Sequence, residues 1–171
     1  MRRVRPLRQL PALLCAAVLA ACVAPQYDDQ TDKLISQLQS DVDTQLVTLI
    51  SLDHKIAALS QRSDPASQKA LTEARIKASY DANTGFYDKI DVDLTSLQTR
   101  VDSEPTHATP DLDRSILLLR QNLVSGPGSL QQTHEAQNIL SEPYLRSVEQ
   151  IVNAQMGALL TREIGLKAGS K

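Results

Sequence analysis

The sequence predicts an all-α protein, an elongated antiparallel four-helix bundle whose third helix is interrupted. Apolar residues recur at steps of three and four along most of the chain, which is the spacing of one helix face. Pro25, Pro65 and Pro105 leave two uninterrupted stretches of 39 residues between them. No segment alternates apolar and polar residues long enough to indicate a sheet, and short connections between long helices favour antiparallel neighbours.

The first helix is predicted between residues 28 and 62. Its apolar stripe consists of Leu34, Ile35, Leu38, Val42, Leu46, Leu49, Leu52, Ile56 and Leu59. Asp64 and Pro65 follow as an N-cap and a first helical residue, so a second helix is expected to begin there.

The second helix is predicted from Pro65 to the region before Pro105, with a strict heptad seam. The seam residues, separated by alternating steps of four and three, are Ile76, Tyr80, Asn83, Tyr87, Ile90, Leu94, Leu97 and Val101. Asn83 is the polar member of this seam. Gly85 lowers helix propensity by roughly 1 kcal/mol relative to Ala, so a gentle kink is expected near it.

The third helix is predicted from Pro110, with Thr109 as its N-cap. Residues 125–129, Ser-Gly-Pro-Gly-Ser, must interrupt it, and residues 130–140 are expected to continue it. The fourth helix opens at Pro143 and frays after Gly165. Together the helices define a bundle domain over residues 31–167.

The first residues of the chain are predicted to be an export signal. Residues 1–9 contain four arginines and no acid: Arg2, Arg3, Arg5 and Arg8. An apolar run follows over residues 10–21, and it is too short to span a bilayer. The run ends in Leu19-Ala20-Ala21-Cys22. This ending resembles the lipobox of bacterial lipoprotein precursors.

The lipobox resemblance implies that Cys22 is the lipidated residue, carrying acyl chains such as palmitate. Leu19, Ala20 and Ala21 would be the residues that the signal peptidase recognises. Residues 1–21 would then be removed as a signal peptide, and residues 22–30 would form a short tether. Val23, rather than Asp, after the cysteine implies the outer membrane as the address. The competing interpretation is an apolar segment cut nearby by ordinary signal peptidase.

Charge counts support anchoring by lipid rather than by a basic patch. Removal of the signal would leave 14 Lys and Arg against 20 Asp and Glu, a formal charge of -6 that anionic lipid repels. We therefore expect a protein of the cell envelope, bound to the periplasmic face of the outer membrane through its lipid anchor. The whole chain has a net charge of -2 and no Trp, so no nucleic acid partner is expected.

The predicted bundle also resembles a group of small, uncharacterised helical lipoproteins of Gram-negative bacteria. The shared features are Tyr27-Asp28-Asp29-Gln30-Thr31-Asp32 and a central helix with Tyr80, Phe86-Tyr87-Asp88, Leu94, Leu97 and Arg100. The break at residues 125–129 departs from that pattern. The resemblance implies a fold and an address and no biochemical activity.

Catalytic and metal-binding patterns are not found in the sequence. His54 and His134 have no ligand at a helical spacing of three or four, and His107 lies in a predicted loop, so we expect surface histidines. Asp88 and Asp91 share a helix face, where a solvated acidic surface is expected. Nucleophile elbows, phosphate-binding glycine loops and haem-attachment motifs are also lacking. The sequence therefore predicts no enzyme, no metal site and no cofactor.

Two functions remain open from the sequence. The first is a non-enzymatic structural or protein-interaction module, working with an unidentified envelope protein. The alternative is a periplasmic helical binding protein that holds a small ligand or metal between helices. The candidate pocket for that alternative is formed by Tyr80, Asn83, Phe86 and Tyr87, although these aromatic residues also suit a packed core.

Overall fold

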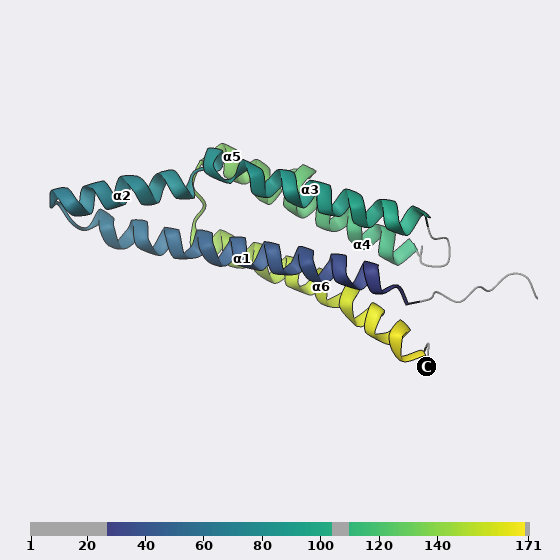
Figure 1. The fold of residues 1–171 in the computed structure, drawn as a ribbon. Coiled ribbons are helices and arrows are strands. Elements are labelled where there is room, and N and C mark those ends of the chain that lie inside the picture. Colours follow the sequence, from purple (N-terminus) through teal and green to yellow (C-terminus); the bar gives the residue numbers. More distant parts are fainter. Residues whose placement is uncertain (1–26, 104–109, 170–171) are drawn as a thin grey trace, which may run out of the picture.

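The computed structural model describes residues 27–103 and 110–169, and within them every regular element is a helix. In chain order the helices are α1 (Asp29–Ser60), α2 (Pro65–Ala78), α3 (Tyr80–Ser103), α4 (Pro110–Arg120), the π-helical turn η1 (Gln121–Ser125), α5 (Leu130–Gln137) and α6 (Glu142–Gly169). They form four rods that alternate in direction, namely α1, α2 with α3, α4 with η1 and α5, and α6 (Figure 1). The predicted all-α antiparallel bundle with an interrupted third helix is confirmed.

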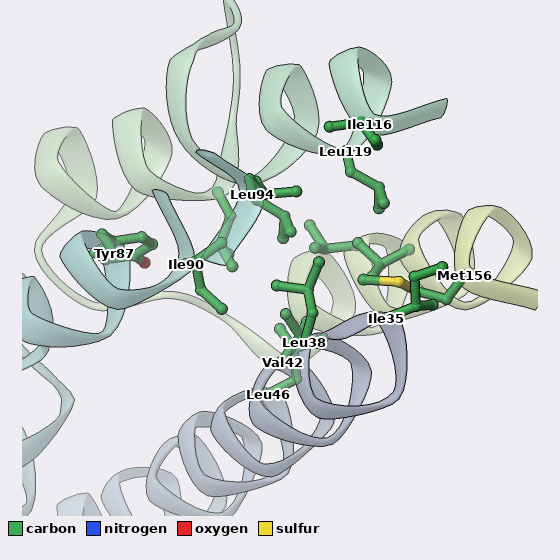
Figure 2. Packing of buried hydrophobic residues seen from close by; sticks show 14 of the residues in the cluster. Ile35, Leu38, Val42, Leu46, Tyr87, Ile90, Leu94, Ile116, Leu119 and Met156 are labelled. Atoms are coloured by element: carbon green, nitrogen blue, oxygen red, sulfur yellow. The ribbon is translucent and has the colours of Figure 1, made fainter. Parts of the chain in front are cut away.

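The core forms where the apolar stripes of α1, α3, α4 and α6 meet (Figure 2). Its fully buried members include Ile35, Leu38, Val42, Leu46, Tyr87, Ile90, Leu94, Ile116, Leu119 and Met156. Burial of each such side chain contributes about 1.5–3 kcal/mol to stability. The seam predicted after Asn83 therefore lies in the core, and so does the stripe predicted for the first helix from Ile35 to Leu49. The last three residues of that stripe lie outside the core and are half-buried: Leu52, Ile56 and Leu59.

The predicted interruption of the third helix lies at Gly126. The backbone N–H of Gly126 donates to the carbonyl of Gln121, 2.9 Å away, which closes the wider turn of η1. A side chain at Gly126 would collide with the backbone of Gln121, and Gly128 adopts a positive φ of 73°. Ser129 then caps α5 by accepting from the N–H of Gln132.

The second rod is also broken, which the sequence did not predict. Ser79 is extended, with φ -70° and ψ 154°, so α2 ends at Ala78 and α3 begins at Tyr80. The break lies at Ser79 rather than at Gly85, through which α3 runs without interruption. The heptad seam starts only after this break. Ile76, predicted to belong to the seam, is consequently 61% exposed.

The bundle contains four helical rods side by side over only part of its length. The first backbone N–H of α6, from Glu142, donates to Asp53, and the first of α3, from Tyr80, donates to Asn138 just beyond α5. Past these points only the end of α1, the following turn and α2 continue (Figure 1). We call residues 54–78 the distal hairpin and the remainder the four-helix section.

Candidate functional site

The residues of the predicted pocket lie on the first two turns of α3. The rings of Tyr80 and Phe86 contact the ring of Tyr87, with centroids 5.8 Å and 5.1 Å apart. The ring of His134, on α5, meets both tyrosines edge to face at 5.8 Å and 5.9 Å. The structure therefore brings the three predicted aromatic residues together and adds a histidine to them.

His134 is completely buried, so its prediction as a surface residue is wrong. Its Nε2 lies 2.9 Å from the carbonyl oxygen of Ala78, which can only accept, so Nε2 carries the proton. Its Nδ1 then accepts from the hydroxyl of Tyr87 at 2.8 Å. Burial lowers the pKa of His134 and raises the pKa of Tyr87, which keeps both groups neutral. The other two histidines differ, since His54 is exposed and pairs with Glu142 while His107 lies outside the described residues.

Asn83 uses its side chain to satisfy the backbone at the break. Its Nδ2 donates to the carbonyls of Lys77 at 3.0 Å and Ser79 at 2.7 Å, and its Oδ1 accepts from Gln45 at 2.6 Å. A helix that ends at Ala78 leaves its last carbonyls without intrahelical partners. The polar residue in the predicted seam is therefore explained by the junction between α2 and α3.

The polar groups around the predicted pocket are engaged with one another. Besides the bonds above, the hydroxyl of Tyr80 accepts from Gln131 at 3.1 Å. Two hollows are found elsewhere. One of about 360 Å³ lies between the end of η1 and α5, and one of about 100 Å³ lies beside Tyr144 and Val148. The contacts of Tyr80, Asn83 and Tyr87 connect α2, α3 and α5 and hold the junction closed.

Most of the basic side chains of the four-helix section pair with acidic ones. Asp91, of the predicted acidic face, pairs with Arg120. Nearby on α3, Lys89 donates to Asp93 and to Asp41, both at 2.6 Å. Within residues 27–103 and 110–169, no three His, Cys, Asp or Glu side chains gather in a way that could hold a metal ion.

A second cluster joins the two motifs of the predicted lipoprotein resemblance at the N-terminal end of α1. Asp28 caps α1 by accepting from the N–H groups of Gln30 and Thr31, both at 3.2 Å. The same carboxylate accepts from Nε and an Nη of Arg100 on α3, at 2.8 Å and 3.1 Å. Bonding to this guanidinium holds the pKa of Asp28 far below its usual range. We call Asp28, Thr31 and Arg100 the N-terminal clamp.

Tyr27 extends the N-terminal clamp to the last helix. Its hydroxyl donates to Asp32 at 3.0 Å, and Lys167 of α6 lies 5.0 Å from the centre of its ring. These contacts were not predicted from the sequence. A signal for them was present, because Tyr27, Asp28 and Arg100 all belong to the motifs on which the predicted lipoprotein resemblance rests.

The predicted lipidation site lies outside the described residues. This applies to the signal peptide over residues 1–21, its recognition residues Leu19, Ala20 and Ala21, the lipidated Cys22 and most of the tether over residues 22–30. Among the helices that the structure does describe, none combines the length and the apolar character needed to cross a membrane.

The fold defines the chain as an all-α helical bundle protein. In comparisons with known protein families, curated proteins and solved structures, no match was found for this chain.

Proposed function

We propose that this protein is a lipoprotein of the bacterial envelope, anchored through Cys22 to the periplasmic face of the outer membrane. Its helical bundle acts there as a non-enzymatic structural or protein-interaction module. The observation that carries the proposal is the Leu19-Ala20-Ala21-Cys22 box at the end of a basic and then apolar leader. The acidic remainder of the chain supports it, because such a body needs acyl chains to stay on a membrane.

Only a short segment links Cys22 to the bundle. Residues 23–27 separate Cys22 from the N-cap Asp28, and an extended chain spans at most about 3.3–3.6 Å per residue, or roughly 20 Å here. The N-terminal clamp would therefore lie close to the leaflet. The far end of α1, 32 residues long at about 1.5 Å per residue, would lie roughly 48 Å further away.

The contacts at the predicted pocket favour an interaction module over the alternative of a small-ligand or metal-binding bundle. A binding bundle needs polar groups that are free to meet a ligand. The Tyr87 hydroxyl and the Asn83 amide are both engaged in holding the junction between α2 and α3. Most of the charged side chains instead lie on the surface, where another protein can meet them.

Substitution of Cys22 tests the anchor. Cys22→Ser is expected to abolish palmitate labelling and to move the protein from the membrane fraction to the soluble fraction, with its helical circular dichroism unchanged. Cys15→Ser is the matched control, because Cys15 lies within the predicted signal peptide and should be dispensable. Palmitate incorporation that persists in Cys22→Ser would contradict the proposal.

A further inference from the structure

The distal hairpin is basic, although the protein as a whole is acidic. Residues 54–78 carry two acids, Asp64 and Glu73, against five basic side chains: Lys55, Arg62, Lys69, Arg75 and Lys77. The other described residues carry eight basic and seventeen acidic side chains. The part of the molecule that projects beyond α5 and α6 therefore has a charge opposite to that of the four-helix section (Figure 1).

The basic side chains of the two parts also differ in their pairing. In the four-helix section, Lys33, Lys89, Arg100, Arg120, Arg146 and Arg162 each form an ion pair with Asp or Glu. The five basic residues of the distal hairpin are all exposed, and none forms an ion pair with another described residue. Since no carboxylate of the described residues forms an ion pair with them, these five charges are available to a partner.

The arrangement of the charges on α2 restricts the shape of that partner. Buried Ser67, Leu71, Ala74 and Ala78 mark the face of α2 that packs on α1. At 100° per residue, Arg75 and Lys77 fall on the two flanks of this face, and Lys69 falls on the outer side beside exposed Ile76. A flat lipid surface can meet only one of these sides. An extended chain can pass across several of them.

We propose that the distal hairpin is a docking surface for an extended, acidic polypeptide segment of a partner protein. Carboxylates of the segment pair with Lys69, Arg75 and Lys77, and an apolar side chain covers Ile76. A polypeptide offers both kinds of group, whereas an acidic polysaccharide offers carboxylates alone. This inference rests on the proposed interaction role and names the chemistry of the partner. Its binding contacts themselves do not depend on lipidation.

The experiment uses the full chain held on a sensor surface by a tag after Lys171, because α6 ends far from the distal hairpin (Figure 1). The first probe is poly-L-glutamate, and the second is a synthetic 20-residue glutamate peptide with a leucine at every fifth position. Both are expected to bind, and binding should weaken as salt rises from 50 to 300 mM because screening weakens contacts between exposed charges.

Variants separate a defined site from general charge attraction. Lys77→Glu is expected to weaken binding of both probes about fivefold or more. Arg114→Glu is the matched control, because Arg114 is an exposed cation of the four-helix section, and it should change binding less than about twofold. Ile76→Asn should weaken only the leucine-containing peptide.

Three results would overturn the proposal. The first is no saturable binding of either polypeptide by the unmodified chain. The second is an equal loss of binding in Lys77→Glu and Arg114→Glu, which would indicate attraction by net charge. The third is equally tight binding of polygalacturonate or of vesicles containing 30% phosphatidylglycerol, which would assign the hairpin to a polysaccharide or to a membrane. None of these results depends on Cys22, so they are distinguishable from a failure of the lipid anchor.

Discussion

The four-helix section and the distal hairpin are built from the same helix α1, yet they are stabilised differently. In the four-helix section α1 packs against two other rods, through α3 and α6, and its stripe residues from Ile35 to Leu49 are buried. In the distal hairpin α1 packs against α2, and its stripe residues Ile56 and Leu59 are half-buried. The same apolar spacing therefore gives a core in one region and a thin contact in the other, because burial depends on how many helices pack around it.

The largest difference between the regions is expected for a charge placed in the core. Leu94→Asp should lower the free energy of unfolding by about 4 kcal/mol, because Leu94 is fully buried and the new carboxylate has no partner there. Glu73→Ala, on the exposed side of α2, should change it by less than about 0.5 kcal/mol. Urea unfolding of both variants measures this, and equal losses would contradict the packing described for α3.

The two aspartate N-caps give a closer comparison. Asp28→Ala should cost about 3 kcal/mol, because it removes a cap and leaves the partly buried Arg100 without its carboxylate. Asp64→Ala, at the start of α2, removes a cap alone and should cost about 1 kcal/mol.

The pH dependence of Asp28→Ala checks its mechanism. Because the pKa of Asp28 is lowered in the folded state, its contribution is present above the unfolded pKa of about 3.9 and is lost as the pH falls further. The gap in stability between the unmodified chain and Asp28→Ala should therefore narrow from pH 5 to pH 2. A gap that stays constant would mean that the pair with Arg100 contributes nothing.

His134 tests the boundary between the regions. Its pKa is lowered by burial, so between pH 7.5 and 5.5 the unfolded chain takes up a proton that the folded chain resists. The free energy of unfolding should therefore fall by up to about 1.4 kcal/mol over this pH range because of His134. His134→Gln should lose that dependence, whereas His54→Gln, at an exposed position, should retain it. Urea midpoints at the two pH values measure the difference.

The smallest expected effect is a gain in stability. Gly85→Ala should raise the free energy of unfolding by about 0.5–1 kcal/mol, because Gly85 lies inside α3 with open space around its Cα. Gly126→Ala should instead destabilise the protein, by about 1–3 kcal/mol, because the added carbon meets the backbone of Gln121. Thermal unfolding of both variants would show opposite shifts. A destabilising Gly85→Ala would mean that α3 is kinked where it is described as continuous.

Helix periodicity was sufficient to predict the fold and the core. The stripe of the first helix and the seam from Tyr87 to Val101 were predicted from spacing alone, since spacing reports directly on which face is buried. The break at Ser79 was missed because its signals are not local. Asn83 is a nearby partner of two carbonyls at the break. The backbone N–H of Tyr80 and the carbonyl of Ala78 are instead satisfied by Asn138 and His134, more than fifty residues away in sequence.

The N-terminal clamp was missed for the same reason. Asp28 could be read as a cap from its neighbours, whereas its pairing with Arg100 joins residues 72 positions apart. The predicted pocket shows the opposite error, because its four residues do lie together but their polar groups are used by partners that the sequence did not indicate.

The N-terminal clamp also decides how a mechanical load enters the protein. A pull applied at Tyr27 reaches the bundle first through Asp28, whose carboxylate is bonded to both α1 and Arg100 of α3. The force is therefore shared between two rods at once instead of peeling α1 away turn by turn. Two guanidinium bonds and the cap must break together before α1 can unwind from that end. For a chain held at its N-terminus, this arrangement reinforces the point of attachment.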